Sequence, residues 1–134
     1  MNLFREKAFT LSELMVSALI LALILVSIVV VLTNINLLNE ANRNLTIAVT
    51  HAGYLIEEIK NASFTGLESA IDSDVWDFTS AQLSATYGLS GLNNESVDTK
   101  VEQSGDPLEI SVAVNWTDIS QRNRSITLST LRTN

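Results

Sequence analysis

Side chains that could perform chemistry are few and scattered in this sequence of 134 residues. There is one histidine, His51, and there is no cysteine, so thiolate catalysis, disulfides and cysteine-ligated zinc are excluded. Three carboxylates lie close together in the sequence and offer a weak candidate for a Ca²⁺ site: Asp72, Asp74 and Asp77. Their spacing does not match an EF-hand loop, so solvated or helix-capping acids are the favoured interpretation and no metal site is predicted.

The only cationic cluster outside the N-terminus is formed by Arg122 and Arg124, which could contact a phosphate or another anion. The net charge of −7 opposes long-range attraction of nucleic acid, so no nucleic-acid partner is expected. His51 is predicted on the polar side of a helix, where it would be solvated. The sequence contains neither a Gly-rich phosphate loop nor a G-x-S-x-G motif. These observations predict a non-enzymatic protein without a cofactor.

Residues 9–32 form a long apolar segment, "FTLSELMVSALILALILVSIVVVL", with one charge, Glu13. A helix needs about 20 apolar residues to cross a bilayer, so the segment is long enough to span a membrane. It is too long for a secretory signal core, and no A-x-A-like cleavage site follows it. The alternative is a buried helix of a larger soluble assembly. Arg5 and Lys7 precede the segment, which predicts a cytoplasmic N-terminus and an extracytoplasmic remainder.

Glu13 is costly inside such a helix, because a charge in the bilayer loses its hydration. One interpretation is that its carboxylate reaches back to the cytoplasmic interface. The other is that a second molecule supplies a cationic partner. The apolar segment alone leaves both open.

The stretch "KAFTLSELMVSALILALIL" resembles the N-terminus of type IV prepilins and type II secretion pseudopilins. The resemblance implies a basic leader at residues 1–8 and cleavage by a prepilin peptidase between Ala8 and Phe9. Phe9 would then become an N-methylated N-terminus. Most members of the superfamily carry Gly where this chain has Ala8.

The same resemblance assigns an assembly role to the residues that follow the cleavage point. Glu13 would be the fifth residue of the mature chain and would pair with the N-terminal amine of a neighbouring subunit. Phe9, Thr10 and Leu11 would belong to the same contact as the helices pack into a filament. A desolvated carboxylate and ammonium are each costly alone, so their pairing would fix the register of subunit addition.

Beyond residue 33 the polarity changes, but the helical period continues through residues 34–62. An apolar stripe recurs at alternating spacings of three and four: Leu38, Ala41, Leu45, Ala48, Ala52, Leu55 and Ile59. Packing of this stripe on a downstream sheet is favoured over a coiled coil. Gly53 lowers the helix propensity, either to allow close approach of a strand or as a tolerated defect. The helix is expected to end near residues 61–63.

Residues 63–134 are predicted to form a small globular domain, with short helical turns near residues 65–71 and 80–86. Strict alternation predicts three antiparallel strands at residues 97–101, 108–116 and 124–131. The fold class is therefore α+β, a pilin-like lollipop in which one long N-terminal helix packs on an antiparallel sheet of about three strands.

The segments "VAVNWTD", "RSITLSTLRT" and "IAVTHAGYLIEEIKN" are similar to PilV-type minor pilins and GspI-type minor pseudopilins. The resemblance implies a structural subunit of the bacterial inner membrane that joins the initiating or tip complex of a type IV pilus, or a type II secretion or competence pseudopilus. Its partners would be other subunits, the prepilin peptidase and inner-membrane lipid. The alternative is a single-pass membrane-anchored binding module outside the pilus pathway.

Overall fold

The structure is a computed structural model that describes residues 10–89 and 91–134. The expected leader at residues 1–8, with Arg5 and Lys7, and the expected processing site at Ala8 and Phe9 lie outside the described residues. The chain divides into two compact units, Met1–Glu40 and Ala41–Asn134.

Seven helices and strands make up the described part of the chain. In order they are α1 (Leu11–Asn61), α2 (Leu67–Asp72), β1 (Phe78–Thr79), α3 (Ser80–Tyr87), β2 (Ser96–Gln103), β3 (Leu108–Thr117) and β4 (Asn123–Arg132). Helix α1 ends where the sequence predicts, and both expected helical turns are present as α2 and α3.

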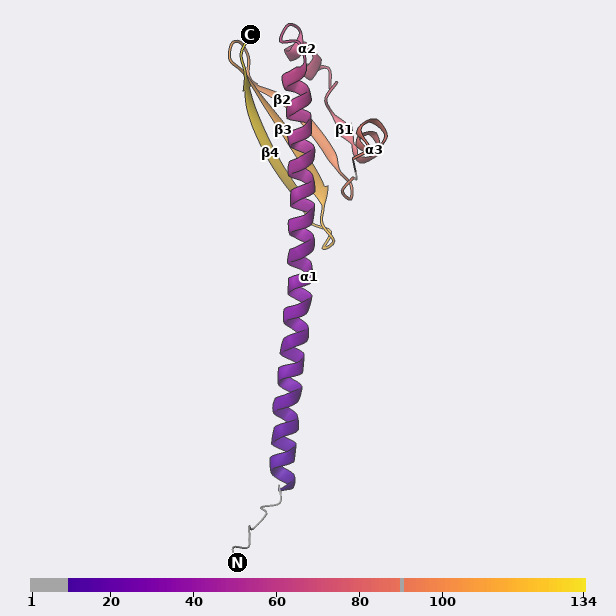
Figure 1. Cartoon of the computed structure of the whole chain (residues 1–134), viewed down its shortest axis with the longest axis vertical. Helices are drawn as coiled ribbons and strands as arrows, with labels where there is room; N and C mark the ends of the chain where they lie inside the picture. Colours follow the sequence, from indigo (N-terminus) through magenta and orange to yellow (C-terminus); the bar gives the residue numbers. More distant parts are fainter. Residues whose placement is uncertain (1–9, 90) are drawn as a thin grey trace, which may run out of the picture. The chain divides into compact units, whose positions relative to one another are not determined.

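Helix α1 is continuous from the apolar segment into the C-terminal unit (Figure 1). Its N-terminal part, through residue 39, is exposed on every side in the described structure. This helix is long and apolar enough to cross a membrane, and none of its most apolar window is buried in the protein. The described part of the chain therefore does not itself bury these apolar residues.

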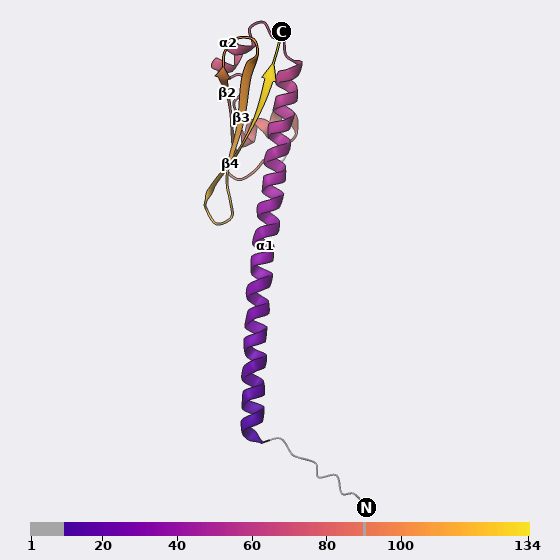
Figure 2. The ribbon, with the colours of Figure 1, turned by 90° about the vertical axis from the view of Figure 1, so that its left-hand side faces the viewer.

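In the C-terminal unit, the four strands form an antiparallel meander in the order β1-β2-β3-β4. The sequence predicts three of these strands, and the fourth, β1, is too short to produce an alternation. Strand β3 pairs with β4 in an unbroken register from Leu108↔Arg132 to Thr117↔Asn123. The C-terminal part of α1 runs alongside the sheet in both views (Figures 1 and 2). The predicted α+β fold is confirmed.

The core of this unit lies between one face of α1 and one face of the sheet. Strand β3 contributes every second residue to it, as its alternation predicts: Leu108, Ile110, Val112, Val114 and Trp116. Helix α1 contributes Ala48, Ala52, Leu55, Ile56 and Ile59, and Leu83 of α3 is also fully buried. Small alanines at positions 48 and 52 allow the helix to approach closely, and the larger residues after them fill the core.

Two details of the predicted helix stripe are wrong. Leu38 is 62% exposed and Leu45 is 44% exposed, so the stripe is buried only from Ala48 onward. His51, expected in solvent, is buried with 2% exposure. Position 51 lies three residues after Ala48 and four before Leu55, so helical geometry places it on the buried face beside Ala52. The predicted stripe contains one residue per helical turn, whereas the buried face contains two neighbouring residues per turn, such as His51 with Ala52 and Leu55 with Ile56.

Gly53 lies within α1, and a Cβ added to it would meet nothing within 4 Å. No strand approaches it, so Gly53 is a tolerated defect. Gly53→Ala is expected to raise the free energy of unfolding by about 0.5–1 kcal/mol, because alanine loses less backbone entropy in a helix. Urea denaturation followed by tryptophan fluorescence measures this, since Trp76 and Trp116 both belong to the C-terminal unit. Gly105→Ala is the matched control and should destabilise, because Gly105 has a φ of +107°.

Candidate functional site

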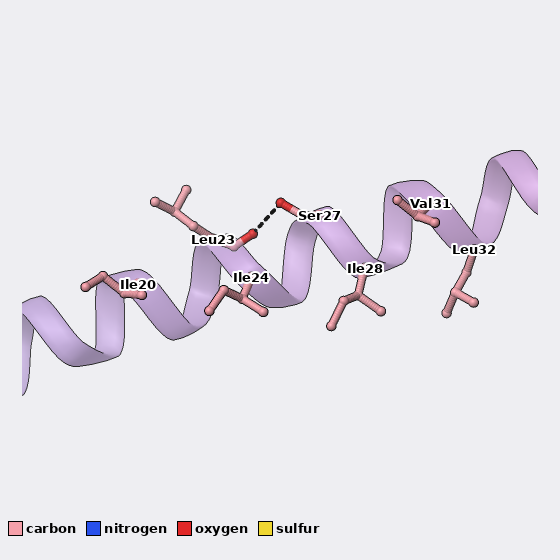
Figure 3. A pocket seen from close by; sticks show the side chains of 7 residues that line it. All are labelled: Ile20, Leu23, Ile24, Ser27, Ile28, Val31 and Leu32. Atoms are coloured by element: carbon pink, nitrogen blue, oxygen red, sulfur yellow. Dashed lines mark hydrogen bonds between the residues drawn. The ribbon is translucent and has the colours of Figure 1, made fainter.

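Between residues 14 and 33, α1 presents a surface that is polar only at its backbone and at a few hydroxyls. Figure 3 shows the side chains of Ile20, Leu23, Ile24, Ser27, Ile28, Val31 and Leu32, which line a shallow groove on this single helix. The hydroxyl of Ser27 donates to the carbonyl oxygen of Leu23 at 2.8 Å. Ser17 and Thr33 donate in the same way to the carbonyls four residues earlier, at 2.7 and 2.9 Å. The hydrogen-bonding capacity of these hydroxyls is therefore satisfied without water. A surface in contact with lipid or with other apolar helices requires this, because no water is available there.

Glu13 lies in the first turn of α1, and its carboxylate forms a capping box with Thr10. Glu13 Oε2 accepts the Thr10 backbone N–H at 2.8 Å and the Thr10 hydroxyl at 2.9 Å. In return, Thr10 Oγ1 accepts the Glu13 backbone N–H at 3.3 Å. This reciprocal pattern satisfies donors that the helix start would otherwise leave unpaired. Within residues 10–89 and 91–134, no cationic side chain contacts Glu13.

A buried His–Glu pair joins α1 to the loop before β2. His51 Nδ1 lies 2.5 Å from Glu95 Oε1, and the two residues are 2% and 3% exposed. The other carboxylate oxygen of Glu95, Oε2, accepts the backbone N–H of Leu92 at 2.7 Å. Glu95 thus holds its own loop and the helix at once.

The loop around Glu95 is also tied to α3. The backbone N–H of Ser80 donates to the carbonyl of Glu95 at 3.1 Å. At Gly91, an added Cβ would lie 2.1 Å from Ser80 Oγ, so a side chain there requires Ser80 to move. Glu95 therefore links its own segment to both α1 and α3.

Arg122 and Arg124 meet at one carboxylate in the turn between β3 and β4. Each donates its Nε–H to Asp118 Oδ2 at 3.1 Å, and their side chains are 64% and 47% exposed. The other oxygen, Asp118 Oδ1, accepts the backbone N–H groups of Ser120 and Arg122 at 2.8 and 3.0 Å. The two arginines do project from one exposed surface, and Asp118 offsets part of their charge.

The hydrogen bond from the Arg122 backbone N–H is the main cause of the lowered pKa of Asp118. Burial acts in the opposite direction. The side chains of Arg124 and Arg122 and the backbone N–H of Ser120 lower the pKa further. A carboxylate with a lowered folded pKa stabilises the fold above its ordinary pKa, and this contribution is lost as pH falls through the folded value. Asp118→Asn is therefore expected to destabilise at neutral pH, with the difference from wild type shrinking below about pH 4.

Urea titrations at several pH values measure this effect. Asp106→Asn, in the turn between β2 and β3, is the control, because the Asp106 side chain makes no hydrogen bond within the described residues. A stability difference for Asp118→Asn that stays constant down to pH 2 would contradict the assignment.

The three acidic residues of the weak Ca²⁺ candidate lie at the end of α2 and just beyond it. Asp77 Oδ1 accepts the backbone N–H of Thr99 at 2.7 Å. Burial raises the pKa of Asp77, this hydrogen bond lowers it, and the neighbouring charges of Asp98 and Asp74 raise it. Asp72 lies at the end of α2, and Asp74 has a φ of +57°. Among the described residues, no group of three or more His, Asp or Glu side chains is placed to hold a metal ion.

Comparisons with known proteins do not assign the chain to a family. No protein-family description, no curated protein and no solved structure matches the sequence or the fold.

Sequence reasoning missed both polar pairs that the structure brings together, although it singled out Glu13 and His51 individually. The capping box could have been found, because Thr10 and Glu13 have the T-x-x-E spacing that defines it. The pairing of His51 with Glu95 spans 44 residues and has no local sequence signal.

Proposed function

We propose that this chain is a minor pilin or minor pseudopilin, a non-enzymatic subunit that assembles through its N-terminal helix after removal of a leader. The observation that carries the proposal is Glu13, the one charged side chain in the apolar segment at residues 9–32, whose described residues are all exposed. The helix needs a cover, and Glu13 needs a cation that the described residues do not supply. A neighbouring subunit with a free N-terminal amine would provide both.

The capping box is compatible with this role. Helix N-termini carry a partial positive charge and unpaired N–H groups, so a carboxylate in the first turn is held in place before assembly. On assembly, the same carboxylate would exchange the Thr10 contacts for the ammonium of the neighbour. The capping box would then serve as the resting state of the assembly contact.

The domain adds two supporting features. The chain has no cysteine, so the domain is held by its core and by polar pairs such as His51–Glu95. Its sheet is covered by the C-terminal part of α1, which contributes its buried face to the core.

The test is intact mass and N-terminal sequencing of the full chain after co-expression with a prepilin peptidase. The expected product begins at N-methylated Phe9. Ala8→Gly should raise the processed fraction, and replacement of Ala8 by a bulky leucine should abolish processing. A chain that still begins at Met1 with both Ala8 and Ala8→Gly would contradict the pilin pathway and favour the membrane-anchored binding module, with Arg122 and Arg124 as its first candidate contacts.

A further inference from the structure

The outer edge of β4 has no strand beside it in the described structure. Strand β4 is the last in the sheet order and pairs only with β3, through ten consecutive residue pairs without a register shift. Among the described residues, no backbone hydrogen bond links Asn123–Arg132 to any segment outside this ladder. A long, straight, unpaired edge is a template for a further strand, and proteins usually blunt such edges.

The opposite edge of the same sheet is blunted in several ways. Strand β1 covers only the first two positions of β2, at Phe78↔Val97 and Thr79↔Ser96. Two residues further along β2, the Asp77 carboxylate accepts the Thr99 N–H, and the Trp76 carbonyl accepts the Thr99 hydroxyl at 3.2 Å. The register with β3 also shifts between Val101 and Gln103. One edge is thus protected and the other left open.

The side chains of β4 suit pairing on its free side. Ile126 and Leu128 pack against the core but stay half-buried, so a further strand would cover their remaining apolar surface. The alternate residues Ser125, Thr127 and Ser129 are small, exposed and hydroxylated. They present no bulky or charged group that would obstruct an added strand.

The charge around β4 defines the partner. Residues 119–134 contain three arginines and no acidic residue, in a chain of net charge −7. Arg122 and Arg124 share the single carboxylate of Asp118, and Arg132 Nη2 donates to the Ala62 carbonyl at 2.6 Å, which neutralises no charge. The edge therefore keeps a positive excess at both ends, which favours an acidic strand.

We propose that β4 is a docking edge onto which another protein chain adds an extended, net acidic segment as a fifth strand. Main-chain hydrogen bonds along Asn123–Arg132 supply the affinity, and the arginines at the two ends select the charge. A second copy of β4 is a poor occupant, because antiparallel self-pairing brings Arg124 of one copy near Arg132 of the other. The proposal rests on the sheet edge alone and does not depend on assembly into a filament.

The test uses the full chain, isotopically labelled and solubilised in a mild detergent. The probes are two ten-residue peptides in which every second residue is valine. In the glutamate peptide the residues between the valines are threonine and glutamate, and in the lysine peptide they are threonine and lysine. Amide hydrogen exchange and chemical shifts locate any binding. The glutamate peptide is expected to protect alternate amides of β4 and to leave β1 and β2 unchanged, whereas the lysine peptide binds at least about tenfold more weakly.

Two variants at one exposed position sharpen the test. Thr127→Glu should weaken binding of the glutamate peptide by about fivefold, and Thr127→Lys should strengthen it by a similar factor. Neither change touches the core. Equal binding of both peptides, binding at the β1–β2 edge, no binding at millimolar peptide, or protection of β4 by self-association without peptide would each overturn the proposal.

Discussion

Glu95→Ala is expected to lower the free energy of unfolding of the C-terminal unit by about 3–5 kcal/mol. The variant leaves His51 buried beside an empty space and removes the acceptor of the Leu92 N–H. Breaking a buried polar pair on one side costs more than the pair itself contributes, because the remaining group is neither hydrated nor paired. Since whole domains have a net stability of about 5–15 kcal/mol, the variant should lose a large fraction of its stability.

Two matched variants separate the charge of Glu95 from its hydrogen bonds. Glu95→Gln keeps an acceptor for Leu92 and a polar neighbour for His51, so its cost should be about 1–2 kcal/mol. In the double variant His51→Leu with Glu95→Gln, the loss of unfolding free energy should differ from the sum of the losses in the two single variants, because the two residues are in contact. Glu57→Ala removes an exposed pair with Lys60 and should cost less than about 1 kcal/mol.

Urea denaturation of the full chain in detergent, followed by the fluorescence of Trp76 and Trp116, measures these values. Both indoles are in the unit that Glu95 stabilises. A cost for Glu95→Ala no larger than that for Glu57→Ala would show that water or another group replaces the carboxylate.

The parts of the fold that follow from local periodicity could be predicted from the sequence. Strand β3 shows this best, because each residue of its apolar alternation is buried as expected. The turn between β2 and β3 was also predictable, since Gly105 and Pro107 mark it. In these segments, residue type and spacing alone determine which face meets the core.

The polar contacts within the core could not be predicted, because they depend on tertiary neighbours. The polarity of histidine predicts a surface position for His51. Its burial is possible because Glu95 provides a polar partner within the core. Strand β1 has only two residues and forms because Val97 and Ser96 lie beside it. Two residues are too few to show the alternation that predicts a strand. The open edge of β4 is likewise a property of the sheet order and is invisible in any single segment.

Glu13→Gln is expected to reduce incorporation of the chain into filaments by at least about tenfold, the second large effect predicted for this protein. Glutamine preserves the capping box, because its side-chain oxygen can accept the same Thr10 donors that Glu13 Oε2 accepts. The substitution removes only the charge. Helix formation should therefore be unchanged, while the proposed ion pair with a neighbouring N-terminus could no longer form.

Glu13→Ala completes the comparison, because it removes both the charge and the cap. It should lower helix stability by about 1 kcal/mol and reduce assembly as strongly as Glu13→Gln. Glu40→Gln, in the same helix, is the control for loss of a carboxylate elsewhere and should assemble normally. Circular dichroism in detergent reports the helix, and the filament fraction after co-expression with the assembly machinery reports incorporation.

The pair of Glu13 variants decides between the two roles that the structure leaves for this carboxylate. If Glu13→Gln assembles like wild type and only Glu13→Ala fails, Glu13 acts as a helix cap and the N-terminus of a neighbour is not its partner. If both fail while only Glu13→Ala loses helix stability, the charge itself is required. A carboxylate that is held by Thr10, in an apolar segment with no other charge, is then available to bind the next subunit.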